Sequence, residues 1–190
     1  MVDNMKKYSS RLFGAIIIIA FLIMLYWVEG SNWSSQAVAQ YNGGFGTFDM
    51  KTYDVRTVET VLAYMAPEGY KISYRYYIGD YLCIVFFGLL QCMISRIVYH
   101  SLKSRTQVAY SIFTLSIAIP ILRGIADIIE NTMLVYTLMR YPVINKAMIE
   151  IATIATQIKL GCIKIWVLLI IAGLVMRMIV KCKGIMYKKE

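Results

Sequence analysis

The chain has 190 residues, of which 59% are hydrophobic and 16% are charged, and its formal net charge is +9. A soluble domain of this length could not cover so much apolar surface, so the composition excludes an ordinary soluble protein and indicates one that lies in lipid. A positive charge would suit nucleic acid, but basic residues at the ends of apolar segments are explained better as membrane-topology signals, and we expect no nucleic-acid partner.

Four apolar segments predict one all-α integral membrane domain, residues 1–190, built as a bundle of four transmembrane helices. The expected spans are about residues 12–28, 78–99, 108–139 and 158–180, each long enough for a hydrocarbon layer of about 30 Å. A cleaved signal peptide is the competing interpretation of the first span, because Lys6 and Lys7 precede it and "AVA" follows at 37–39. That triplet lies too far beyond the apolar run, so we expect an uncleaved helix.

The first outer loop, residues 29–77, is expected to be structured. "NGGFG" at 42–46 indicates a turn, and "TFDMKTYD" after it indicates a short strand or an extended segment. Asp54 is a suitable N-cap for a short amphipathic helix in "DVRTVETVLAYMAPEG", and Pro67 and Gly69 are expected to end that helix.

Tyrosines gather just before the second span, and we interpret them as an interfacial belt that anchors the chain rather than as ligand contacts. They are Tyr70, Tyr74, Tyr76, Tyr77 and Tyr81. In the second outer loop, "RYPVINKAMIEIATIATQ" predicts either an early start of the fourth helix or a segment that lies flat on the membrane.

Basic residues predict the orientation, because Lys and Arg concentrate on the cytoplasmic side. If four helices alternate, one side holds Lys6, Lys7, Arg11, Arg96, Lys103, Arg105, Arg177, Lys181, Lys183, Lys188 and Lys189. The other side holds Lys51, Arg56, Lys71, Arg75, Arg140 and Lys146, diluted by acidic residues. We therefore expect a multi-pass protein of the plasma or inner membrane with both termini in the cytoplasm.

The third span contains an unusual polar cluster, "RGIADIIENTM" at 123–133. Helical spacing of three or four places Arg123, Asp127, Glu130 and Asn131 on one face. Counting along the helices puts Asp80 and Lys159 at a similar depth in the outer half of the bundle. These six residues are the candidate ligand-binding site.

Two interpretations of the cluster remain open. In the first it is an outward-facing polar site for a lipid headgroup or small solute, where Arg123 and Lys159 hold anionic groups while Asp127 and Glu130 orient them or exchange protons. In the second it is an interhelical lock of a non-catalytic accessory protein, in which Arg123 pairs with Asp127 and Lys159 with Glu130 or Asp80. The general tendency of charges in spans to mark sites favours the first slightly.

Pro120 lies just before the cluster and removes one backbone donor, which predicts a kink or loosened turn. The single histidine, His100, lies at the opposite end of the bundle, which excludes a Ser/His/Asp or Cys/His triad at the cluster. Acid/base chemistry by paired carboxylates stays open, and no catalytic residue is assigned. No cofactor is expected, and no metal, because carboxylates alone would bind one only if Arg123 and Lys159 stayed clear. The four cysteines form no C-x-x-C, which argues against a thiol–disulfide oxidoreductase.

Several segments together resemble a group of small bacterial four-span membrane proteins that have no assigned activity. The segments are "FGTFDMKTYDV", "VETVLAYMAPEGYKISYRYYIGDYL", "IADIIENTMLVY" and "IATQIKLGCIK". The shared features are an aspartate at the start of span two (Asp80), D-x-x-E-N in span three, and a lysine at the head of span four (Lys159). The resemblance implies a four-helix membrane core and polar positions that act together. The expected partners are membrane lipids and, through the outer loop, a further membrane protein.

Overall fold

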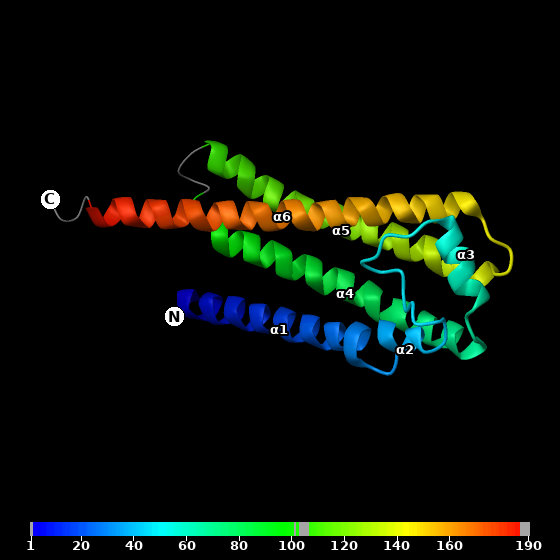
Figure 1. Ribbon diagram of the computed structural model, residues 1–190. Coiled ribbons are helices and arrows are strands. Elements are labelled where there is room, and N and C mark those ends of the chain that lie inside the picture. The colour runs from blue at the N-terminus through cyan, green and yellow to red at the C-terminus, as the bar shows by residue number, and fades with distance from the viewer. Residues whose placement is uncertain (1, 101, 103–106, 187–190) are drawn as a thin grey trace.

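Four long helices run along one another in the computed structural model, which describes residues 2–100, 102 and 107–186. They are α1 (Val2–Gly30), α4 (Pro67–Tyr99), α5 (Gln107–Arg140) and α6 (Lys146–Met186). Two short helices, α2 (Ser35–Ala39) and α3 (Val55–Ala63), lie together at one end, which we call the loop end. The first described residues of α1 and the last described residues of α6 lie at the other end, which we call the terminal end (Figure 1).

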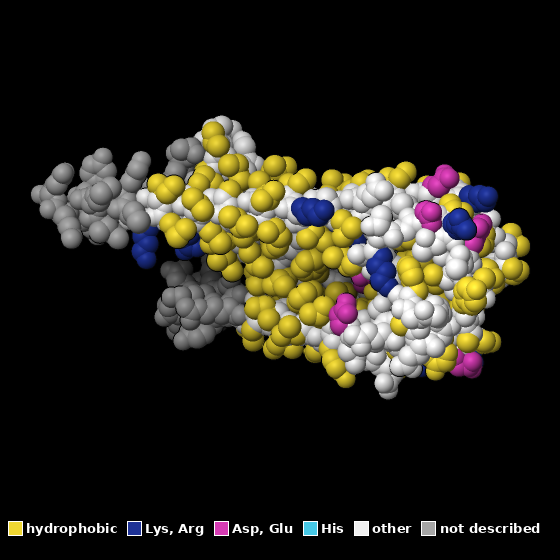
Figure 2. Space-filling model, in the orientation of Figure 1, with side chains coloured by type: hydrophobic (Ala, Val, Ile, Leu, Met, Phe, Trp, Pro, Cys, Tyr) yellow, Lys and Arg dark blue, Asp and Glu magenta, His cyan; other side chains and the backbone are white. Residues whose placement is uncertain are grey.

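Each of the four long helices is long and apolar enough to cross a membrane. Hydrophobic side chains cover most of the middle of the visible face, whereas the visible Asp and Glu side chains gather toward the loop end and Lys and Arg occur at both ends (Figure 2). The chain is therefore a multi-pass membrane protein with an all-helical fold, as the composition predicts. Basic residues at 103 and 105 and at 188 and 189, used to predict the orientation, lie outside the described residues.

The helices pack mainly as a chain of neighbours, α1 on α4, α4 on α5 and α5 on α6. Gly79 of α4 permits the close approach of α1, since a Cβ at this position would lie 2.3 Å from Cδ1 of Trp27. The indole nitrogen of Trp27 also donates to the carbonyl oxygen of Arg75 at 3.2 Å. The α1–α4 contact is thus set within one turn of Asp80.

The predicted loop boundaries are too wide. Helix α4 begins at Pro67 rather than at residue 78, because proline at the first helical position has a preset φ and needs no amide donor. The same proline follows the end of α3, which Asp54 caps as predicted. Helix α6 begins at Lys146, which selects the early start over a surface-bound segment. In the described residues, 47–54 form bends and extended segments and no strand.

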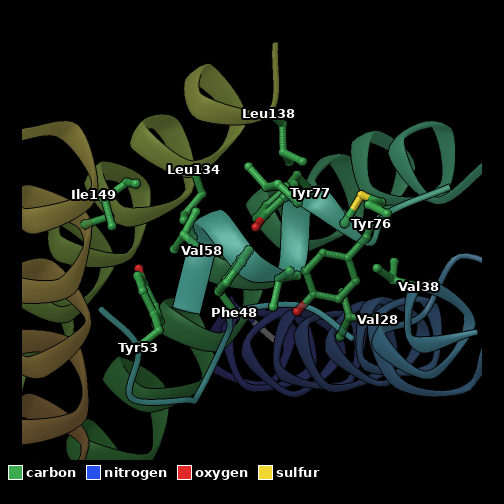
Figure 3. Packing of buried hydrophobic residues seen from close by; sticks show 14 residues of the cluster. Val28, Val38, Phe48, Tyr53, Val58, Tyr76, Tyr77, Leu134, Leu138 and Ile149 are labelled. Atoms are coloured by element: carbon green, nitrogen blue, oxygen red, sulfur yellow. The ribbon is translucent and has the colours of Figure 1, made fainter. Parts of the chain in front are cut away.

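A hydrophobic core fixes the loop against the helices at the loop end. Figure 3 shows side chains from both short helices, the loop and all four long helices meeting there. Its labelled members are Val28, Val38, Phe48, Tyr53, Val58, Tyr76, Tyr77, Leu134, Leu138 and Ile149. Because burying an apolar side chain is favourable by about 1.5–3 kcal/mol, this core holds the loop in one position over the bundle.

The tyrosine-belt interpretation is wrong for two members of the group. Tyr76 and Tyr77 are only 1% and 3% exposed and belong to the core. They sit side by side on α4 with their rings edge to face, 5.4 Å between centroids. The folded loop covers this turn of α4, so both side chains face the loop and not the lipid interface.

Candidate functional site

Helix α5 brings its polar residues onto one buried face, as the three- and four-residue spacing predicts. Arg123 Nη1 donates to Asp127 Oδ2 at 2.9 Å, one turn along the helix. Arg123 Nη2 donates across the bundle to the carbonyl oxygen of Ile84 on α4 at 3.0 Å. The guanidinium also lies over the ring of Phe87, 4.7 Å from its centroid, a favourable cation–π arrangement. Arg123 is 2% exposed, so these contacts replace most of its hydration, while its buried Nε has no hydrogen-bond partner among the described residues.

Lys159 of α6 is the centre of the site. Its ammonium contacts Asp127 Oδ1 at 3.0 Å and Glu130 Oε2 at 2.6 Å, both on α5. The Glu130 contact is an ion pair rather than a well-directed hydrogen bond. A third carboxylate comes from the loop, where Asp49 Oδ1 lies 2.5 Å from the ammonium. Lys159 is 1% exposed, so its charge is balanced inside the protein.

Asp80 of α4 joins the same region through a neutral partner. Its Oδ2 accepts a 2.7 Å hydrogen bond from Nδ2 of Asn131 on α5. Within the described residues no ion pair joins Asp80 to a cation, although the residue is only 6% exposed. The negative charges of Asp49 and Asp127 and the positive charge of Lys159 are all close enough to act on it. All six predicted residues are thus brought together, and with Asp49 we call them the loop-end network.

The amino-acid pattern did not identify Asp49 as part of the site. A glycine turn positions it: Gly43, Gly44 and Gly46 have φ of 68°, 86° and 81°, values that glycine adopts without strain. The side-chain amide of Asn42 donates to the carbonyl oxygen of Gly46 at 2.7 Å and accepts from its N–H at 2.9 Å. This clamp reverses the loop and directs the next residues back toward α6.

Hydroxyl groups connect the loop to the network. Tyr76 donates to Asp49 Oδ2 at 3.3 Å, and the Tyr53 hydroxyl lies 3.4 Å from Glu130 Oε1 and 3.1 Å from Thr156 Oγ1. Burial, and then the negative charge of Glu130, raise the pKa of Tyr53 far above its ordinary value. Tyr53 is therefore a neutral hydrogen-bond donor. The sequence feature that could have identified Asp49 and Tyr53 as site residues is their position in "FGTFDMKTYDV", one of the segments that carry the resemblance.

The carboxylates are spaced as in a metal site, but a lysine occupies the space between them. Oxygens of Asp49, Asp127 and Glu130 lie within 4.8 Å of one another, a spacing that would suit a hard cation. The ammonium of Lys159 contacts all three residues. A metal ion would therefore have to displace the lysine, so these three residues do not form a preformed metal site.

Deeper in the bundle, Pro120 and its surroundings form a separate polar contact. Proline cannot donate to the carbonyl four residues earlier, and here that carbonyl, of Ser116, accepts from the Ser95 hydroxyl at 2.9 Å. The indole nitrogen of Trp166 donates in turn to Ser95 at 3.0 Å. The Ser116 carbonyl, which Pro120 leaves without a backbone donor, is therefore part of a hydrogen-bonded chain that links α4, α5 and α6. Helix α5 continues through Pro120 as one helix.

The loop-end network can hold charge in three ways: it can keep protons, pair charges internally, or accept a further cation. Four carboxyl groups, from Asp49, Asp80, Asp127 and Glu130, face two cations, Arg123 and Lys159.

No protein-family model matches the chain, and neither does any curated protein or solved structure. This result is consistent with the resemblance to a group of membrane proteins that has no assigned activity.

Proposed function

We propose that this protein binds a small cationic group at the loop-end network, presented by a lipid headgroup or by a free solute. The observation that carries the proposal is Asp80, a nearly buried carboxyl group with a neutral hydrogen-bond partner, in a network that has more carboxyl groups than cations. Burying a carboxylate without a counter-charge costs several kcal/mol. A bound cation would remove that cost.

The sequence predicted that Arg123 and Lys159 hold anionic groups, whereas the contacts of these two residues favour a cationic ligand. Both Arg123 and Lys159 are already paired with carboxylates at 3.0 Å or less, so neither is available to an anion without losing those partners. Asp49 is the more accessible acid, with 18% of its side chain exposed at the loop end. A ligand would approach through Asp49 and reach Asp80.

We place the loop end on the outer side of the cell membrane and both termini in the cytoplasm. The support is the excess of Lys and Arg in the segments at the terminal end. In this orientation the site is in the outer half of the bundle beneath the folded loop, where it can receive a lipid headgroup from the outer surface. A membrane-protein partner for the loop remains a prediction from the sequence.

The test is a cation titration of the purified protein in nanodiscs, with the unfolding temperature as readout. The probes are sodium, calcium and ethanolamine salts at constant ionic strength. A probe at 100 times its Kd should stabilise the folded protein by about 2.7 kcal/mol. Asp80→Asn, which keeps a polar group beside Asn131, should remove this response, whereas Glu68→Gln, an exposed acid at the same end, should keep it.

Nanodisc composition separates the two sources of the cationic group. If a lipid supplies it, phosphatidylethanolamine discs should stabilise the protein relative to phosphatidylcholine discs, and Asp80→Asn should abolish that difference. If a solute supplies it, a soluble probe should act equally in both discs. Equal stability of wild type in all salts and both lipids would refute the proposal.

A second candidate is the interhelical lock, and one observation favours it specifically. Both buried cations have direct ion pairs, and the network joins the loop, α4, α5 and α6. Asp127→Asn and Glu130→Gln would then lower stability strongly with every probe absent. Under the binding proposal these substitutions also reduce the response to the cation.

A further inference from the structure

A large groove lies at the terminal end, away from the loop-end network. Its volume is about 1150 Å³, and it is bounded by the middle of α1, the second half of α4 and the first half of α5. Most lining side chains are apolar, among them Phe13, Ile17, Leu89 and Ile121. Ligand sites of proteins have this character, a mostly apolar lining with a few polar groups at fixed places.

The groove exists because α1 packs mainly on α4. At the loop end Gly79 lets Trp27 approach α4 closely, as described above. At the terminal end the corresponding contact is looser: Gly14 of α1 faces Met93, where a Cβ would lie 3.2 Å from the sulfur. Helix α1 therefore forms one wall of the groove and α5 the other, with α4 between them.

The charge along the groove is uneven. Among the described residues that line it, Arg96 and His100 are basic and none is acidic. Arg96 lies in the last turn of α4 and His100 is its C-cap, so these two residues, four positions apart, lie on one side of the helix end. Both side chains are exposed. The groove thus has N–H donors and positive charge at the membrane edge and apolar walls leading from it toward the bilayer centre.

We propose that this groove binds an anionic phospholipid of the leaflet at the terminal end, with its phosphate at Arg96 and His100 and acyl chain against α1 and α5. Basic side chains between membrane helices are the usual recognition elements for anionic headgroups. Charge complementarity argues for this occupant, because a neutral lipid or a second apolar helix would leave Arg96 without an anionic partner. The proposal is independent of the cation site at the loop end.

The test uses the full chain in detergent, equilibrated with equal amounts of phosphatidylglycerol and phosphatidylcholine of identical acyl chains. Native mass spectrometry then gives the ratio of the two bound lipids. Wild type should retain phosphatidylglycerol preferentially, and Arg96→Gln should lower the ratio about fivefold, as expected for one basic side chain at a membrane surface. The control Lys181→Gln removes an exposed charge near the same end outside the groove.

A second variant tests the walls of the groove. Ala118 is exposed and lines it, so Ala118→Trp should fill the space and reduce the amount of both bound lipids. Circular dichroism and elution volume verify folding of each variant. Equal retention of the two lipids by wild type, or equal effects of Arg96→Gln and Lys181→Gln, would overturn the proposal. A change from dimer to monomer in Ala118→Trp would also overturn it, since a second copy would then occupy the groove.

Discussion

Removing the charge of Lys159 should be among the most damaging single changes to this protein. Lys159→Met keeps a long unbranched side chain but deletes an ammonium that contacts three carboxylates at 2.5, 3.0 and 2.6 Å. Arg123, already bonded to Asp127, would be the remaining cation of the loop-end network. The side chain is 1% exposed, so little water can replace the lost contacts.

The expected loss follows from that burial. Breaking a buried ion pair by removing one partner typically lowers the free energy of unfolding by about 3–5 kcal/mol. A second substitution, Glu130→Gln, should recover part of this loss in the Lys159→Met background, because it removes one uncompensated carboxylate. The coupling between the two positions is expected to be about 0.5–3 kcal/mol.

Equilibrium unfolding in mixed detergent micelles with increasing dodecyl sulfate measures these differences. Lys164→Met is the matched control, since Lys164 lies on the same helix with an exposed side chain. That control should be neutral or stabilising, because it places an apolar group on an exposed face of a span. The reasoning is refuted if Lys159→Met costs no more than Lys164→Met, or if Glu130→Gln makes the Lys159→Met protein less stable.

Three further predictions concern other parts of the chain. Gln91 is fully buried, and its side-chain amide has no hydrogen-bond partner within the described residues. Gln91→Leu should therefore leave the free energy of unfolding unchanged or raise it by about 1 kcal/mol in a thermal unfolding experiment. A clear loss of stability would reveal a partner for the amide. Gly79→Val should separate α1 from α4, because its Cβ would overlap Trp27, and a cross-link between cysteines introduced into the two helices should then form more slowly; an unchanged rate would contradict the packing. Hydrogen bonds from the Thr57 hydroxyl and then its N–H lower the pKa of Asp54, so the charged cap stabilises α3 above the unfolded-state pKa and is lost as pH falls through the lower folded-state pKa. Hydrogen exchange of α3 should therefore accelerate from about pH 5 to about pH 3 relative to Asp54→Asn, whose amide cap does not titrate; equal pH dependence of the two proteins would exclude this role.

Features set by local periodicity could be predicted from the sequence. The four long apolar helices, the N-cap at Asp54 and the shared face of Arg123 and Asp127 all follow from spacing along a helix. Counting residues from the middle of each span placed Asp80 and Lys159 in the same half of the bundle as the α5 cluster, although it did not identify Asn131 as the partner of Asp80. These predictions hold because the membrane thickness restricts where each turn of a long helix can lie.

The rest depends on tertiary packing that no short-range pattern encodes. Asp49 reaches Lys159 because a glycine turn reverses the loop and a hydrophobic core anchors it. Tyr76 resembled an interfacial residue because the pattern does not reveal that the loop covers it. Pro67 was predicted to stop a helix, whereas α3 already ends at Ala63 and Pro67 is the first residue of α4. The charge balance of the loop-end network includes Asp49, whose place in the network only the folded loop shows.

The central claim is that a cation binds beside Asp80. Its most direct test is a cryo-electron microscopy map of the protein in nanodiscs, at a resolution that shows ordered water, with the cation that stabilises it most. The account predicts density for that cation next to Asp49 and beside a carboxylate oxygen of Asp80, at about 2.3–2.6 Å for calcium or about 2.7–2.9 Å for an ammonium group. This density should be absent in Asp80→Asn. A map in which Asp80 contacts Asn131 alone, with no density between Asp80 and Asp49, would contradict the account.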